Sequence, residues 1–251
     1  MRRLMMKLLL CAAAILLPQA ALAQWPPEKL KNLKVLPPDI TVRALVDTMA
    51  GFTRALGVRC SFCHVGKESE PLDKYDFASD DKSEKMKARE MLRMVTAINS
   101  EHLAKLVSRR NPKIVVACAT CHHGISQPRP LQQVLLMAYD AGGADSVESA
   151  YRALRTRYYG AAAYDFGEVP LVDVGNALHA RTQEADALRI YKFNTEVSPT
   201  STFAFRSVAG AQLSAGDTAG AVASFQRALS INPNDQQSKD AIDRLHPKPF
   251  K

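Results

Sequence analysis

The sequence predicts an all-α protein made of two parts, with little β-sheet. Apolar residues recur at helical spacing in the first part, and a repeat of 34 residues occupies much of the second. Four of the five cysteines form two pairs of identical spacing, both in the first part. With 251 residues, of which 47% are apolar, the chain is long enough for two modest domains and can bury a core.

The first 23 residues have the pattern of a secretory signal peptide. Arg2, Arg3 and Lys7 precede the apolar run from Leu8 to Leu17, and a small-residue cleavage pattern ends at Ala23. The run is too short for a membrane-spanning helix, which needs roughly 20 apolar residues. We therefore expect cleavage after Ala23 and export to the periplasm.

Two long helices are predicted in the first part. One starts near Asp39 to Thr41 and ends at Gly57. The other opens at the capping pair Asp80-Asp81 and closes at Arg109-Arg110, before Asn111-Pro112. Their apolar stripes contain Leu45, Met49, Phe52 and Leu56 in the first helix and Met91, Met94, Val95, Ile98 and His102 in the second.

The two cysteine pairs have the CxxCH spacing that covalent haem attachment requires. They consist of Cys60, Cys63 and His64 in the first motif and of Cys118, Cys121 and His122 in the second. On a helical turn, positions i, i+3 and i+4 share one face. Two thiols can therefore reach the two vinyl groups of one haem while the histidine binds its iron. The sequence thus predicts two covalently bound haem c groups.

Three other uses of the cysteines explain less of the pattern. A zinc site built from both pairs would span the long separation between Cys63 and Cys118, whereas compact zinc ribbons have about 15 to 20 residues between pairs. Disulfides suit an exported protein, and a thiol redox motif suits CxxC, but neither explains the two histidines. Haem attachment alone uses all four cysteines, both histidines and the export signal.

The charge of the chain gives no support to nucleic-acid binding. Lys and Arg outnumber Asp and Glu by 33 to 25, and three of the basic residues belong to the predicted signal peptide. Two haems would add four propionates, which would offset most of the remaining surplus. We therefore expect protein partners and no nucleic acid.

Residues 30 to 130 resemble the cytochrome c subunit of photosynthetic reaction centres. The matching strings, in order, are NLKVLPPDI, LVDTMAGFTRALGVRCSFCHVG, DFASDD, AREMLRMVTAIN and CATCHHG. In that family each half-module carries a ligating methionine on the helix before its CxxCH motif. The resemblance therefore implies His64 and Met49 as ligands of the first iron, and His122 and Met91 as ligands of the second.

The chain departs from that family in three ways. It has two haem motifs where the reaction-centre subunit typically has four, so it resembles one half of that protein. A longer segment separates the second methionine helix from Cys118, which leaves Met94 as an alternative to Met91. His123 stands where the family often has arginine or glutamine. A second haem ligated by His102 instead of a methionine is a further alternative.

The second part begins after Pro128 and Pro130, and it contains two aligned stretches of 34 residues, 168–201 and 202–235. The matched pairs are Gly175 with Ala209, Ala187 with Ala221, Tyr191 with Phe225, and Pro199 with Pro233. These stretches resemble tetratricopeptide repeats, most clearly in AGDTAGAVASFQRALSINPND. About three repeats are needed for stability. Residues 131–158 can supply a degenerate first helix pair, and residues 236–245 can cap the end.

The sequence thus predicts a signal peptide over residues 1–23, a dihaem cytochrome c domain over 24–130, and a short tetratricopeptide-like helical solenoid over 131–251. We expect a periplasmic electron carrier that is not an enzyme. Its partners would be redox proteins or a membrane electron-transfer complex, with the repeats either docking a protein partner or shielding the haem domain. The alternatives are a dihaem peroxidase-like oxidoreductase with one open iron and a repeat-based assembly subunit of a respiratory or photosynthetic complex.

Overall fold

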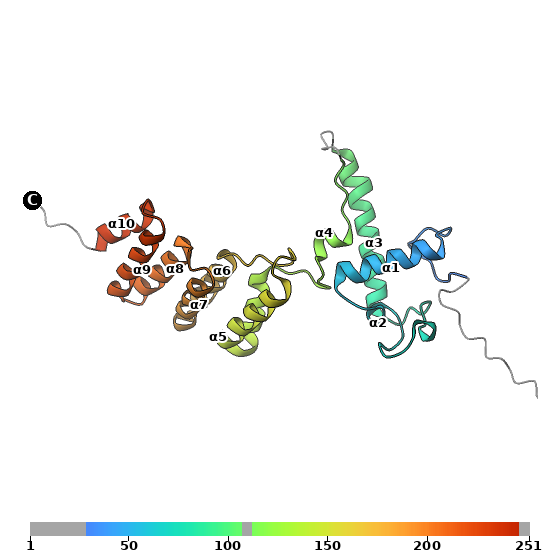
Figure 1. Cartoon of the computed structure of the whole chain (residues 1–251), viewed down its shortest axis with the longest axis horizontal. Coiled ribbons are helices and arrows are strands. Elements are labelled where there is room, and N and C mark those ends of the chain that lie inside the picture. The colour runs from blue at the N-terminus through green and yellow to red at the C-terminus, as the bar shows by residue number, and fades with distance from the viewer. Residues whose placement is uncertain (1–28, 107–111, 246–251) are drawn as a thin grey trace, which may run out of the picture. The chain divides into compact units, whose positions relative to one another are not determined.

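The computed structural model describes residues 29–106 and 112–245 (Figure 1). The predicted signal peptide and the predicted helix end at Arg109-Arg110 lie outside the described residues. The described chain divides into two compact units, one of residues 29–50 and 59–106 and the other of residues 51–58 and 112–245. Every named element in the described residues is a helix, and the one pairing of extended backbone there is an isolated bridge. The predicted all-α fold is confirmed.

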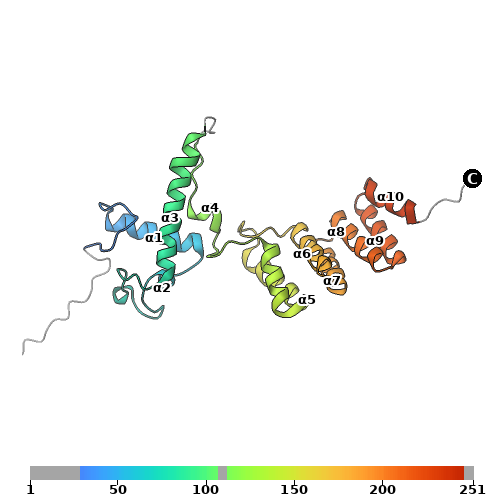
Figure 2. The same ribbon diagram turned by 180° about the vertical axis from the view of Figure 1, so that it is seen from behind.

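The N-terminal helices begin close to the predicted positions. Helix α1 spans Val42–Leu56, and the Thr41 hydroxyl caps it by accepting a hydrogen bond from the Ala44 N–H at 3.2 Å. Helix α2 is a single turn, Cys60–Cys63, and helix α3 spans Ser83–Ala97. Helices α2 and α3 pack against each other (Figure 2).

Helix α3 ends earlier as a regular α-helix than its apolar stripe predicts. The chain continues as a π-helical turn over Ile98–His102 and a 3₁₀ turn over Leu103–Lys105. The Asn99 side chain donates to the Val95 carbonyl at 3.0 Å, and the Ser100 hydroxyl donates to the Thr96 carbonyl at 2.9 Å. Such side-chain bonds compete with the helical backbone pattern, which explains the irregular end.

Asp80 does not cap helix α3, contrary to the prediction. Its carboxylate instead lies 2.9 Å from the Arg89 guanidinium and 3.0 Å from the Lys34 ammonium. It also accepts a hydrogen bond from the Asn32 amide at 2.7 Å. Arg89 also donates to the Asn32 carbonyl at 3.2 Å. These bonds fasten the segment before α1 to helix α3 and leave Arg89 buried.

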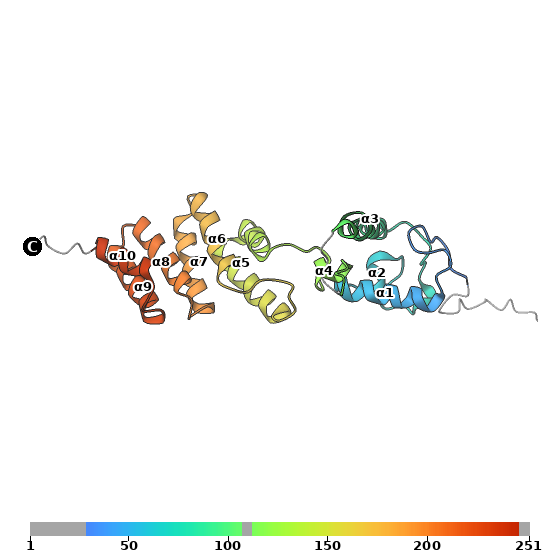
Figure 3. The same ribbon diagram turned by 90° about the horizontal axis from the view of Figure 1, so that it is seen from above.

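The C-terminal helices form a series in which consecutive helices pack together (Figure 3). Helix α5, Leu131–Tyr158, is interrupted at Gly142 and Gly143, where the backbone leaves helical φ/ψ values. The next four helices fall into the two predicted repeats. They are α6 (Val169–Ala180), α7 (Glu184–Val197), α8 (Thr202–Ser214) and α9 (Thr218–Ile231), followed by α10 (Gln236–Leu245).

The matched small residues of the repeats lie at close helix contacts. A Cβ atom at Gly175 would come within 2.3 Å of the Tyr191 ring, so only glycine fits there. In the second repeat, Ala209 and Ala221 are fully buried beside Phe225. In the second repeat, Ala209 takes the place of Gly175, and the smaller Phe225 ring takes the place of Tyr191. The packing of each helix pair therefore accounts for the residue pattern that repeats in the sequence.

The described C-terminal helices bury two apolar clusters, and the smaller one lies over α8 to α10. The larger cluster extends from α5 to α8. Its largest fully buried side chains are Tyr151, Phe193, Leu135, Leu171, Leu178 and Ile190. The Tyr151 ring packs edge-on against Phe193 at 5.4 Å between centroids. No helix in the described part of the chain combines the length and the apolar character that a membrane span requires.

Candidate functional site

The first CxxCH motif forms one helical turn. The His64 N–H donates to the Cys60 carbonyl at 2.9 Å, and the Phe62 N–H donates to the Arg59 carbonyl at 3.0 Å. Cys60 and Cys63 are both free thiols. Burial raises the pKa of the Cys63 thiol, and the nearby Glu84 carboxylate adds to this effect. The motif therefore presents two free thiols one helical turn apart.

His64 lies at the end of this turn in a mostly apolar environment. Its ring packs edge-on against Phe77, with 5.0 Å between centroids. Burial lowers the pKa of His64 to about 4, and the positive charge of Lys85 contributes to the shift. The ring is thus neutral at pH 7, the form that binds a metal. Its Nδ1 atom is buried without a hydrogen-bond partner, which fits a metal ligand better than a packing histidine.

A closed loop after the first motif positions Phe77 beside this histidine. The Asp76 N–H donates to the Val65 carbonyl at 2.9 Å in an antiparallel bridge. The Tyr75 hydroxyl donates to the Lys67 carbonyl at 2.9 Å, and the Tyr75 ring stacks on Phe77 with 5.5 Å between centroids. The string DFASDD, which is part of the predicted family pattern, therefore forms one wall of the first candidate site.

The second motif forms helix α4, Cys118–His122. The Thr120 hydroxyl accepts a hydrogen bond from the Ala117 N–H at 3.0 Å and so fixes the start of the turn. The His122 Nδ1 atom lies 2.8 Å from the Ile125 carbonyl oxygen. A carbonyl can only accept, so Nδ1 carries the proton and the lone pair remains on Nε2. Metal-binding histidines are commonly oriented by such a bond.

The chain reverses sharply after the second motif and returns to the end of helix α1. His123 has a φ of 47° and Gly124 a φ of 84°, both left-handed. The Gly124 N–H donates to the Ala55 carbonyl at 2.8 Å. A Cβ atom at Gly57 would lie 2.0 Å from the Gly124 carbonyl oxygen, so glycine is required at this approach.

The candidate sixth ligands lie on the two long helices of the N-terminal half. Met49 is half-buried on α1, whereas Met91 and Met94 on α3 are 42% and 46% exposed. The Met86 sulfur is 3.2 Å from the Arg89 guanidinium, which engages it within the protein. His102 lies exposed at the end of the π-helical turn. Ligation of iron by Met49 and Met91, with Met94 and His102 as alternatives, remains a prediction.

Residues 29–106 and 112–130 leave several large apolar side chains exposed. In residues 29–106 and 112–130, only Ala55 and Arg89 are buried. The exposed large apolar residues of the same ranges are Phe62, Met86, Met91, Met94, Leu106, Ile114 and Val115. Apolar side chains left uncovered in this number suit contact with a large apolar group, and a haem is such a group.

The described residues contain no cluster of three or more His, Cys, Asp and Glu side chains that could hold a metal ion. A haem site needs no such cluster, because the porphyrin supplies four of the six iron ligands. The chemistry of each CxxCH motif, with two free thiols followed by a histidine, therefore fits a covalently attached haem.

Comparison with known proteins identifies the class to which this site is similar, namely the c-type cytochromes. The family described as "Photosynthetic reaction centre cytochrome C subunit" matches residues 19–134. This match confirms the predicted resemblance over both CxxCH motifs and the helices before them. Residues 135–251 lie outside it.

Cytochrome c-554 of Chloroflexus aurantiacus is 39% identical to this chain over 69 residues. The aligned segment spans 28% of this chain and 14% of cytochrome c-554, so only a small part of that relative is covered. Among solved structures, PcrH in complex with the chaperone binding region of PopB matches 46% of this chain and 89% of its own, with 17% identity and a TM-score of 0.29. A likeness this weak supports no inference about function.

The sequence alone did not reveal the residues that orient the two histidines. Phe77 packs against His64, and the Ile125 carbonyl binds His122, yet neither residue belongs to a CxxCH motif. The conspicuous string DFASDD was the only signal that pointed toward Phe77. Backbone acceptors such as the Ile125 carbonyl leave no mark on the sequence.

Proposed function

We propose that the chain is a periplasmic c-type cytochrome that carries two haem c groups and passes electrons between redox partners without acting as an enzyme. One observation carries the proposal: two separate CxxCH turns each present two thiols followed by a histidine suited to bind iron. The similarity of residues 19–134 to the reaction-centre cytochrome subunit supports it. Its partners would be redox proteins or a membrane electron-transfer complex.

The chain's own residues have distinct roles in this proposal. The thiols of Cys60 and Cys63 hold one haem as thioethers, and those of Cys118 and Cys121 hold the other. His64 and His122 each offer a ring nitrogen to iron, and Ile125 fixes the tautomer of the second. Each haem, when bound, supplies one-electron exchange at its iron. The exposed apolar side chains of residues 29–106 and 112–130 would exclude water from it.

Methionine ligation favours a carrier over a peroxidase-like oxidoreductase. With Met49 and Met91 as sixth ligands, neither iron would keep an open position for peroxide, and a peroxidase would also need a nearby acid-base group. The alternative predicts that one iron binds carbon monoxide rapidly in the reduced protein. Slow or absent binding at both irons would exclude the alternative.

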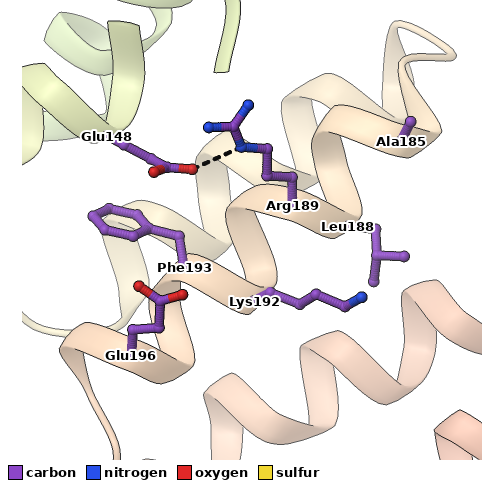
Figure 4. A pocket seen from close by; sticks show the side chains of 7 residues that line it. All are labelled: Glu148, Ala185, Leu188, Arg189, Lys192, Phe193 and Glu196. Carbon is purple, nitrogen blue, oxygen red and sulfur yellow. Dashed lines mark hydrogen bonds and ion pairs between the residues drawn. The ribbon is translucent and has the colours of Figure 1, made fainter. Parts of the chain in front are cut away.

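The C-terminal helices are proposed to dock a protein partner. A hollow of about 340 Å³ lies between α5 and α7, and it is lined by Glu148, Ala185, Leu188, Arg189, Lys192, Phe193 and Glu196 (Figure 4). Arg189 is bound to Glu148 at 2.8 Å, whereas the Lys192 ammonium has no ion pair within the described residues. Lys192 can therefore bind a carboxylate of a partner beside the apolar Leu188.

Intact mass and a pyridine haemochrome assay test the main proposal. Protein exported from a host with a working haem-attachment pathway should begin at Gln24 and carry the mass of two haems. The matched variants Cys60→Ser with Cys63→Ser, and Cys118→Ser with Cys121→Ser, should each carry one haem. An unmodified polypeptide mass for the wild-type chain would overturn the proposal.

The docking role has its own test. Deletion of residues 131–251 should preserve both haems but slow electron exchange with membranes of the source organism. Lys192→Glu should slow it as well, whereas Lys239→Glu, on the exposed side of α10, is the matched control. Unchanged rates in the truncated protein would instead favour a shielding role for the repeats. Copurification of a stable complex that persists in haem-free variants would favour the assembly-subunit alternative.

A further inference from the structure

Two cations of helix α3 are nearly buried close to the first candidate haem site. The side chains of Lys85 and Arg89 are 11% and 6% exposed, whereas that of Lys87, on the same helix, is 71% exposed. A charged side chain is seldom withdrawn from water to this degree unless its charge is compensated or used. The contacts of Lys85 and Arg89 show where their charges are held.

Lys85 is fixed against the segment that forms the wall beside His64. Its ammonium donates to the carbonyl oxygens of Phe77 at 3.0 Å, Ala78 at 3.1 Å and Ser79 at 2.6 Å. The ring of the same Phe77 packs edge-on against His64 at 5.0 Å. The positive charge is therefore held on the backbone of Phe77, whose ring contacts the proposed iron ligand His64. It has little freedom to move.

One carboxylate compensates this group of cations only in part. Asp80 lies 3.3 Å from Lys85, 2.9 Å from Arg89 and 3.0 Å from Lys34. Three positive charges thus share a single negative charge, and two of the three are withdrawn from solvent. The cluster as a whole is positive, and its field at the first site is less screened than that of a surface lysine.

A fixed positive charge changes the balance between the two oxidation states of a nearby iron. Oxidation adds one positive charge to the haem, so a neighbouring cation opposes it and favours the reduced form. A neighbouring anion has the opposite effect. The size of either effect grows as the surroundings become less polar, because water screens the interaction less.

We infer that Lys85 raises the reduction potential of the haem bound to His64, and that Asp80 lowers it, so that this cluster sets the potential of one haem apart from the other. The inference rests on the proposed function, since it needs a haem at the first motif. Lys85 acts through its charge and its hold on the Phe77 segment, which makes it a positioning residue rather than an iron ligand.

Redox titration of the two-haem protein tests the inference with a matched pair of variants. Lys85→Gln and Lys87→Gln remove the same charge from the same helix. Lys85→Gln should lower one of the two reduction steps by up to about 59 mV, a tenfold change in the ratio of reduced to oxidised haem. Lys87→Gln should change that ratio less than twofold at either haem. Equal shifts in the two variants would overturn the inference, because they would reflect net charge alone.

Asp80→Asn separates the electrostatic effect from a loosening of the loop. Loss of the carboxylate should raise the same reduction step that Lys85→Gln lowers, whereas a loosened Phe77 segment would shift the step in one direction for both variants. Shifts of the same sign would therefore overturn the inference. The intact mass of each variant is measured first, to count its attached haems. A variant that carries two haems but shows no shift in potential contradicts only this inference. A protein without attached haem contradicts the proposed function itself.

Discussion

The two halves of the chain differ in what fills their interiors. Among described residues 29–130, only Ala55 and Arg89 are buried, and several large apolar side chains remain exposed. Helices α5 to α10 bury two clusters of aromatic and aliphatic side chains. The second half is therefore stabilised by its own side chains, whereas the first half leaves its large apolar side chains uncovered. This contrast is what two covalently bound haems would produce.

The charges of the two halves also differ in sign. Residues 29–130 contain 18 Lys and Arg against 11 Asp and Glu, whereas residues 131–245 contain 10 against 13. Four propionates would reduce the surplus of the first half without reversing it. A redox partner that approaches the first half therefore meets net positive charge, whereas the repeats carry net negative charge. This difference favours separate binding surfaces on the two halves.

The largest expected effect is the unfolding of one half of the chain while the other half stays folded. Protein in which all four attachment cysteines are serine should lose its fold over residues 29–130, because no haem covers the apolar side chains that are exposed there. Residues 131–245 should remain folded. Hydrogen exchange measured by mass spectrometry should show protected amides in the repeats alone, and the haem-loaded protein is the control. Protection across both halves would show that the first half folds without haem.

A core truncation in the repeats should have the converse effect. Leu178 is fully buried in α6, so Leu178→Ala should destabilise the second half by about 2–5 kcal/mol and leave the haem spectrum unchanged. Val169 is 48% exposed on the same helix, and Val169→Ala should cost no more than about 0.5 kcal/mol. Urea unfolding followed by circular dichroism measures both. A haem spectrum that changes with Leu178→Ala would show that the halves do not act independently.

A smaller effect is expected at the sixth ligands. Met49→Leu and Met91→Leu should each remove about half of the weak methionine-to-iron band at the red end of the oxidised spectrum, because leucine keeps the apolar volume but lacks sulfur. Met86→Leu is the control, since the Met86 sulfur contacts Arg89. Loss of the band in Met94→Leu but not in Met91→Leu would reassign the ligand. A change confined to His102→Ala would indicate a bis-histidine second haem.

The smallest effect concerns acid stability of the first half. Hydrogen bonds from Arg89, and then from Lys34, hold the pKa of Asp80 well below its usual range. A carboxyl group whose folded pKa is depressed stabilises the fold above its unfolded pKa of about 3.9, and that stabilisation is lost as the pH falls further. The difference in unfolding midpoint between wild type and Asp80→Asn should therefore be present at pH 7 and shrink below about pH 4. A difference that is constant with pH would show that Asp80 acts through shape alone.

The sequence predicted the helical fold well because the controlling signals are local or periodic. The starts of α1 and α5 and the two 34-residue repeats follow from capping residues, prolines and apolar spacing. The regular α-helix of α3 stops at Ala97, short of its predicted extent, since the Asn99 side chain competes with the helical backbone there. Asp80 was predicted to cap α3, but its carboxylate instead binds Arg89 within α3 and Lys34, which is distant in sequence.

The candidate site was predictable only as far as its covalent chemistry extends. The spacing of Cys60, Cys63 and His64 can be read from the sequence, because thioether attachment demands it. The environment of the histidine cannot be read in this way. It depends on a loop closure that brings Phe77 back to the motif and on a lysine whose burial no pattern reveals.

The hydrogen bond between the Gly124 N–H and the Ala55 carbonyl has a consequence for the order of events during biogenesis. It joins positions about 70 residues apart, and the whole first motif and helix α3 lie between them along the chain. If the chain is exported from its N-terminus as proposed, Cys60 and Cys63 would cross the membrane before Gly124 does. The haem-attachment machinery would then act on the first motif before the rest of the domain has crossed the membrane. The hydrogen bond between Gly124 and Ala55 would form only after the second motif has also crossed.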